Sequence, residues 1–251
     1  MSGHSKWHSI KHKKAKVDAQ RGKMFTKCIR ELMVAARQGG GDPDMNPRLR
    51  TAIAAAKAIN MPAENIERAI KKATGELEGV SYEEITYEGY APCKVAVIVD
   101  CVTDNRNRTA ADVRSVFNKY NGSLGSSGCV SFLFDKKGLI IIPKQDNVTE
   151  DKLLELTLDA GVEDIIEEDE TFEILSEPLK LEDVKKILED NNYKIESASV
   201  SMLPKTKVRL SETDSEKVYK FLEALEELDD VQNVWSNADF DENFLNKMND
   251  E

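Results

Sequence analysis

The sequence predicts an α+β protein of several domains, with an N-terminal helical domain and two ferredoxin-like α/β modules, one inserted in the other. Three observations predict this fold. Apolar residues recur at helical spacing in the first third of the chain, and β-branched apolar runs alternate with helical patterns after Gly79. The later elements also follow the order β-α-β-β-α-β. The 251 residues suffice for two or three domains with cores of their own.

Three helices are expected in the first domain, residues 1–79. Apolar residues at helical spacing predict that the first helix runs from Lys23 to the glycine run 39–41. Asn46 and Pro47 are typical of the N-cap and first position of the second helix. Pro62 opens the third helix, and Gly75 ends it. Residues 1–16 show no apolar periodicity, and we call them the basic arm.

The inserted module is predicted for residues 138–203. Its expected elements are contiguous in the sequence: strand 139–142, helix 150–160, strands 162–166 and 171–175, helix 179–190 and strand 194–202. This is one complete ferredoxin-like unit.

The elements on either side of this insertion complete the second module. Strand 94–102, helix 109–120 and strand 129–134 precede it, and strand 205–210, a helix carrying Val218 to Leu228 and strand 231–235 follow it. Residues 80–137 with 204–237 are therefore expected to form one discontinuous domain, since surface connections tolerate insertions. Residues 238–251 are polar and are expected to be a frayed tail.

The distribution of charge is more informative than the net charge of −11. Residues 1–79 carry a net charge of +8, whereas the remainder carries −19. Ten basic and only two acidic residues lie in residues 1–37. A basic end on an acidic body predicts a polyanion-binding segment.

The candidate nucleic-acid-binding residues are the cations of the arm and of the first helix. A lysine-rich end that binds nothing is the alternative, but the charge continues onto an amphipathic helix and favours phosphate contact. Composition leaves DNA and RNA open. Trp7 and His12 are added for stacking and polar contact. The full set is Lys6, Trp7, Lys11, His12, Lys13, Lys14, Lys16, Arg21, Lys23, Lys27 and Arg30.

Two further patterns have ordinary structural alternatives. Arg106 and Arg108 lie before a predicted helix, so they could bind an anion there or form ion pairs with a neighbouring domain. The Gly-rich stretch 121–128 contains GxxG, but it joins a helix to a strand and is interpreted as a plain loop. His4, His8 and His12 have metal-ligand spacing, yet the surrounding lysines disfavour a cation and no metal site is predicted.

Several classes of function are excluded. The chain has no phosphate-binding loop and no GxSxG, and histidine occurs only in residues 4–12, so no catalytic site, cofactor or small-molecule substrate is expected. No apolar run is long enough to span a membrane, and the four scattered cysteines favour a reducing, cytoplasmic location. The acidic inserted module, with a net charge of −12, could contact basic proteins.

Six segments carry a resemblance to a known family: GHSKW with KHKKAK, RGKMFTK, AARQGGGDPDMNPRLR, NMPAENIERAIKKATGELEG, YEGYAP and TDNRNRT. With these segments the chain resembles the YebC/PmpR family nearly from end to end. The resemblance implies three domains, one interrupted by another, and no catalytic residues. The family's basic motif maps onto Lys6, Trp7, Lys11, His12, Lys13, Lys14, Arg21, Lys23 and Lys27. Departures near His8 and at Pro92-Cys93-Lys94 are peripheral.

The resemblance leaves two functions open. Bacterial members are generally described as probable transcriptional regulators that bind promoter DNA. Others act on ribosomes, including a mitochondrial activator of translation and bacterial members implicated in elongation through proline-rich stretches. The expected partner is therefore promoter DNA or ribosomal RNA, with ribosomal proteins as partners of the acidic module in the second case.

Overall fold

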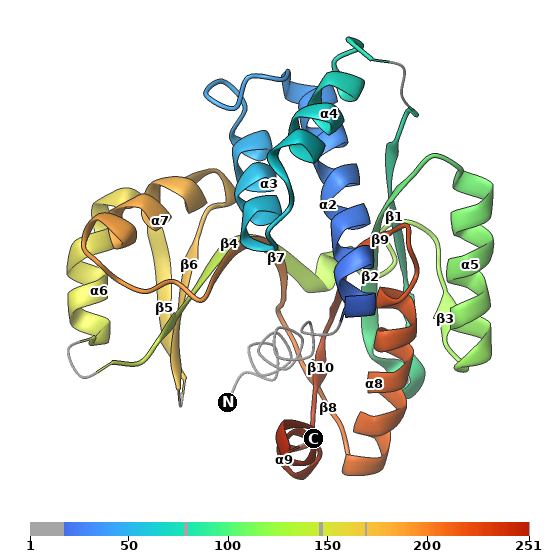
Figure 1. Ribbon diagram of the computed structural model, residues 1–251. Coiled ribbons are helices and arrows are strands. Elements are labelled where there is room, and N and C mark those ends of the chain that lie inside the picture. The colour runs from blue at the N-terminus through green and yellow to red at the C-terminus, as the bar shows by residue number, and fades with distance from the viewer. Residues whose placement is uncertain (1–17, 78–79, 146–147, 169, 251) are drawn as a thin grey trace. The chain divides into compact units, whose positions relative to one another are not determined.

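A computed structural model describes residues 18–77, 80–145, 148–168 and 170–250. Residues 132–207 form one compact unit, and the described residues before and after them form another. Helices alternate along the chain with strands that pair mainly antiparallel, which confirms the predicted α+β fold (Figure 1).

The N-terminal helices are α2 (Asp18–Gly39), α3 (Pro47–Ala58) and α4 (Ala63–Ala73). Their shared core includes Leu32 and Leu49, both fully buried. Asn46 caps α3 as predicted, because its side-chain oxygen accepts the Leu49 N–H at 3.0 Å. The Asn46 amide also donates to the carbonyls of Ala35 and Gly40, both at 2.8 Å, and so joins the end of α2 to the start of α3.

The first sheet has the strand order β3-β1-β2-β9. Its strands are β1 (Glu83–Tyr90), β2 (Ala96–Thr103), β3 (Ser123–Leu124) and β9 (Val231–Ser236), and every pairing is antiparallel. Helices α5 (Arg106–Lys119) and α8 (Glu212–Glu226) pack together on one face. Phe117 of α5 meets Phe221 of α8 edge to face, with 4.9 Å between ring centroids.

The second sheet lies in the 132–207 unit and has the order β5-β6-β4-β7. Its strands are β4 (Phe134–Pro143), β5 (Val162–Glu167), β6 (Thr171–Ser176) and β7 (Ser197–Pro204). Helices α6 (Glu150–Thr157) and α7 (Leu181–Asp190) pack on it around Leu153, Val184 and Leu188 (Figure 1). Numbered by position within the unit, the strands lie 2-3-1-4, the ferredoxin-like arrangement.

The predicted composition of the first sheet was wrong at two strands. The place expected for strand 205–210 in this sheet is taken by β1, which precedes β2 in the chain. Residues 205–210 form only the short strand β8 (Val208–Arg209). β8 pairs in parallel with β10 (Ala238–Asp239) outside the main sheet. With β1 in the third position, the first sheet has the same 2-3-1-4 order as the second. It is thus a ferredoxin-like layer in which one strand comes from a different point in the chain.

The expected strand 129–134 is also absent from the first sheet. Short 3₁₀ turns occur at Pro92–Lys94, Ser131–Leu133, Leu158–Ala160 and Pro178–Lys180. The second of these turns occupies the expected strand, and β4 begins only at Phe134. The reason is Glu88 of β1, whose carboxylate accepts the backbone N–H groups of Gly128, Val130 and Ser131, each at 2.8 Å. These amides are therefore not available to a sheet partner.

The C-terminal segment was wrongly expected to fray. Helix α9 (Glu242–Asp250) follows β10, and Phe240, Phe244 and Leu245 are buried in the same core as α8. Phe244 lies against Tyr219 of α8, with ring centroids 5.6 Å apart. Phe244 and Leu245 anchor this short helix, and the partly buried Met248 adds to the same contact.

Candidate nucleic-acid interface

The predicted binding residues fall into a part that the structure describes and a part that it does not. Seven of them, Lys6 to Lys16 including Trp7 and His12, lie outside the described residues. Arg21 lies in α2, but its side chain is not among those described. The remaining three, Lys23, Lys27 and Arg30, lie on α2 at intervals of three or four residues, so one helical face carries them.

This basic face of α2 contacts the C-terminal end of α8. Lys23 Nζ donates to the Glu227 carbonyl at 3.2 Å, and Lys27 Nζ donates to the Glu226 carbonyl at 2.9 Å. The Arg30 guanidinium donates to the Asp229 carbonyl. The last carbonyls of a helix have no partner within the helix and carry the negative end of its dipole. The cations of α2 thus bind an anionic feature of the same chain.

Asp230 is the centre of the charged cluster beside this contact. Its carboxylate lies 3.1 Å from Arg30 Nη2 and 2.9 Å from Arg108 Nη2, and its side chain is 6 % exposed. The hydroxyl of Thr109 donates to it at 2.7 Å. Burial alone would raise the pKa of Asp230, but the hydrogen bonds from Thr109 and Arg108 and the charge of Arg30 outweigh burial and hold it below its ordinary value. The group is therefore ionised at neutral pH.

The second predicted pair, Arg106 and Arg108, forms ion pairs within the chain. Arg108 also pairs with Asp104 at 2.7 Å, and Asn105 caps α5 by accepting the Arg108 N–H at 3.1 Å. Arg106 Nη1 lies 3.3 Å from Glu83 Oε2 and remains largely exposed. Ion pairs are present, but their partners Glu83, Asp104 and Asp230 lie in the same predicted domain, and both arginines are about half or more exposed, so they are not buried pairs with a neighbouring domain. Anion binding by these two residues stays a prediction.

A cleft of about 690 Å³ opens beside Asp230. It lies between α2, the start of α5 and the turn after α8, and both signs of charge line it. Its lining includes Lys23, Arg30, Asp104, Arg108, Asp112 and Asp230. Arg30 lies over the ring of Tyr82, with 5.7 Å from Cζ to the ring centroid, and its buried Nε has no hydrogen-bond partner among the described atoms. The cleft therefore offers guanidinium and ammonium donors to an anion.

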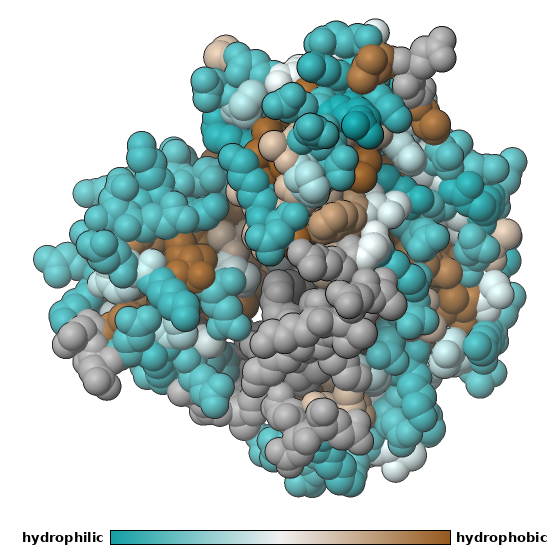
Figure 2. All heavy atoms as spheres, viewed as in Figure 1, coloured by the Kyte–Doolittle hydropathy of each residue, from teal (hydrophilic) through white to brown (hydrophobic). Residues whose placement is uncertain are grey.

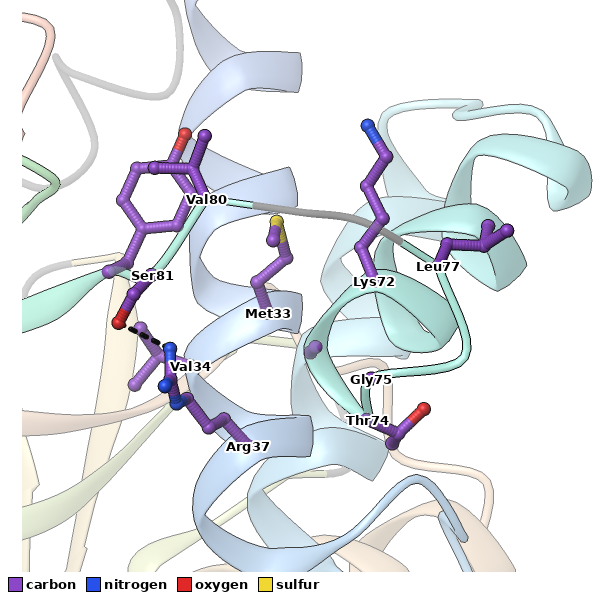
Figure 3. A pocket seen from close by; sticks show the side chains of 11 residues that line it. Met33, Val34, Arg37, Lys72, Thr74, Gly75, Leu77, Val80 and Ser81 are labelled. Carbon is purple, nitrogen blue, oxygen red and sulfur yellow. Dashed lines mark hydrogen bonds between the residues drawn. The ribbon is translucent and has the colours of Figure 1, made fainter.

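A smaller hollow of about 280 Å³ lies between α2 and the end of α4. Figure 3 shows Met33, Leu77 and Val80 around it, with the Arg37 guanidinium directed to the Ser81 hydroxyl. Leu77 and Val80 are partly exposed. The lining combines apolar side chains with Arg37, Lys72 and Thr74, and the Arg37 guanidinium is already bound to the Ser81 hydroxyl.

Sequence reasoning missed Asp230 and Glu88. Asp230 stands in an ordinary turn before a strand, and the only sequence signal for it is an acidic residue adjoining the apolar run 231–235. Glu88 lies on the face of β1 opposite to Tyr87 and is only 5 % exposed. Burial alone would raise its pKa, but the N–H groups of Gly128, Val130 and Ser131 outweigh that effect and lower it. The interpretation of the Gly-rich stretch as a plain loop was wrong for Ser123 and Leu124, which form β3 against β1. The part that follows is a loop, and the Glu88 carboxylate holds its end.

The described residues contain neither a group of metal ligands nor a helix that could span a membrane. Within the described ranges no group of three or more His, Cys, Asp or Glu side chains could hold a metal ion. Among the helices of that same part of the chain, none is long and apolar enough to cross a membrane. On the face that Figure 2 shows, most coloured residues are hydrophilic and the apolar ones gather in small patches.

Known proteins match nearly the whole length of this chain. Residues 5–76 match the family model "TACO1/YebC protein N-terminal domain", and residues 82–238 match "TACO1/YebC second and third domain". A "probable transcriptional regulatory protein" of Persephonella marina is 57% identical over 99% of this chain and 100% of its own length. One of Citrifermentans bemidjiense with the same description is 55% identical over the same shares.

A solved structure agrees with these matches. The crystal structure of the conserved hypothetical protein Aq1575 from Aquifex aeolicus is 54% identical to this chain. The two structures superpose with a TM-score of 0.81, and the match covers 91% of this chain and 94% of the Aq1575 chain. The similarity thus extends from the sequence to the fold.

Proposed function

This chain belongs to the TACO1/YebC family, and from that premise we propose that it is a non-enzymatic regulator of gene expression that binds nucleic acid through its basic arm and α2. The regulator class follows the relatives, which are named probable transcriptional regulatory proteins. Promoter DNA is accordingly the first candidate partner.

The observation that carries the proposal is the separation of charge along the chain. The first 37 residues hold ten basic residues and two acidic ones, while residues 80–251 carry a net charge of −19. Phosphates attract the first segment and repel the rest, so a polyanion has one place to bind. The arm contains lysines and one Trp, which suit backbone contact and stacking.

The proposal is tested by removing the arm's charge. Exchanging Lys11, Lys13, Lys14 and Lys16 for Ala should lower the slope of log affinity against log salt by about 3–4, because each phosphate contact contributes about 0.9 for duplex DNA. A matched control exchanges Lys180, Lys185, Lys186 and Lys194, which lie in the 132–207 unit and give the same change in net charge. An unchanged slope in the arm variant would place the binding site elsewhere.

A translation factor that binds ribosomal RNA is the second candidate. The strongly acidic residues 138–203, with a net charge of −12, favour it because they would repel nucleic acid but attract basic ribosomal proteins. Competition between promoter and scrambled duplexes, run beside a sucrose gradient of cell lysate, separates the two. A preference of roughly 10³ for one duplex supports promoter DNA. Less than about tenfold preference, with salt-reversible sedimentation alongside ribosomes, supports the second candidate.

A further inference from the structure

The basic face of α2 is already occupied in the free chain. Lys23 and Lys27 donate to the two carbonyls at the end of α8, those of Glu227 and Glu226. Arg30 donates to the Asp229 carbonyl in the turn after α8 and pairs with Asp230. These cations belong to the set through which nucleic acid is proposed to bind. A bound phosphate would therefore meet donors that a carboxylate and helix-end carbonyls of the same chain already hold.

Asp230 has the surroundings of a bound anion. Two guanidinium groups and a hydroxyl converge on its carboxylate, at 3.1 Å from Arg30, 2.9 Å from Arg108 and 2.7 Å from Thr109. Guanidinium groups and hydroxyls are the donors that proteins use for phosphate as well as for carboxylate. The donor set does not distinguish the two anions.

The contact between α2 and the end of α8 borders an open cleft beside this cluster. The cleft of about 690 Å³ reaches Lys23, Arg30, Arg108 and Asp230. The Arg108 side chain is 46% exposed, and the buried Arg30 Nε has no partner among the described atoms. An incoming phosphate can therefore reach Arg108 first. It would also offer an acceptor to the Arg30 Nε, which has none in the described part of the chain while α2 contacts the end of α8.

We propose that Asp230 is an internal competitor of the nucleic acid, occupying in the free chain the place that a backbone phosphate takes in the complex. The inference rests on the proposed function and adds a way in which nucleic-acid binding is regulated. Binding displaces the Asp230 carboxylate from Arg30 and Arg108 and frees the basic face of α2 from the end of α8. Affinity is then lower than the charge of the arm and helix alone would give.

The test compares Asp230→Asn with Asp112→Asn. Asp112 lines the same cleft and is exposed, so both substitutions remove one negative charge from the cleft, but only the first removes the competitor. Binding is measured by fluorescence anisotropy with a labelled 30-nucleotide RNA and a labelled 30-base-pair DNA. We expect D230N to bind the preferred probe about tenfold more tightly than the wild type, and D112N to gain at most about threefold.

The outcomes separate this inference from the proposed function. If the wild type binds and D230N gains no more than D112N, Asp230 is not a competitor and this inference alone is overturned. If none of the three proteins binds either probe, the proposed function fails, and this inference fails with it.

A second measurement covers the case in which D230N does not fold. Hydrogen exchange of the amides of residues 226–230 in the wild-type protein should become faster when the RNA or DNA binds, because the end of α8 loses the contacts with α2 that hold it and opens more often. Unchanged or slower exchange in a complex that has formed would show that α2 stays in contact with the end of α8 when nucleic acid is bound. That result would overturn the inference without any substitution.

Discussion

At the scale of single residues, two buried carboxylates organise segments that are distant in sequence. Glu88 fixes the loop before the 132–207 unit, and Asp230 joins α5 and α2 to the turn after α8. Gly89 has a related role, because a Cβ there would lie 2.4 Å from the Ser123 carbonyl oxygen of β3. These residues set which backbone groups can meet.

Replacing Glu88 by Gln should lower the free energy of unfolding by about 1–3 kcal/mol at pH 7, because the amide NH₂ cannot accept the N–H groups that the carboxylate binds. The folded pKa of Glu88 is lowered, so its contribution is present above the unfolded pKa of about 4.3 and is lost as pH falls through the folded value. Urea unfolding at pH 7 and below pH 4 should therefore show a difference that shrinks in acid. Glu67→Gln, on the exposed face of α4, is the control; an equal loss in both variants would contradict the prediction.

At the scale of elements, local signals predicted the helices and several strands, and long-range contacts decided the rest. The N-cap Asn46 and the apolar runs of β2, β5 and β6 are visible in the sequence and lie where expected. Strand β1 was missed because its buried positions hold Glu88 and Gly89, which do not follow an apolar alternation. The apolar stretch 129–134 was taken for a strand because nothing in it shows that Glu88 binds its amides.

The C-terminal helix α9 provides the test at this scale. Exchanging Phe244 for Ala removes a ring that packs against Tyr219 and Phe240, and should cost about 3 kcal/mol of unfolding free energy. Lys247→Ala removes only an exposed ion pair to Glu212 and should cost less than about 1 kcal/mol. Thermal melts of both variants check this. Equal and small effects would mean that α9 frays, as the polar sequence suggested.

At the scale of the whole molecule, the candidate site was predicted as a segment but not as a set of contacts. Charge counting located the basic residues of α2, because charge is a property of composition. It could not show that Lys23, Lys27 and Arg30 would meet the end of α8, since those partners lie about 200 residues away in the sequence. Nor could it assign Asp230 to Arg30 and Arg108.

The bounds of the unit formed by residues 132–207 can be tested with fragments. We expect residues 132–207, expressed alone, to unfold cooperatively, because their four-stranded sheet and two helices share one core. The shorter fragment 138–203 should be clearly less stable. It loses the first four residues of β4 and with them the pairing of Phe134 with Pro204 and of Asp135 with Leu203, and it also loses the buried Phe134 ring. Urea titrations of both fragments, followed by circular dichroism, give the comparison. Two fragments of equal stability would place the boundary at Gly138, where the sequence pattern put it, and a non-cooperative longer fragment would show that the unit depends on the rest of the chain.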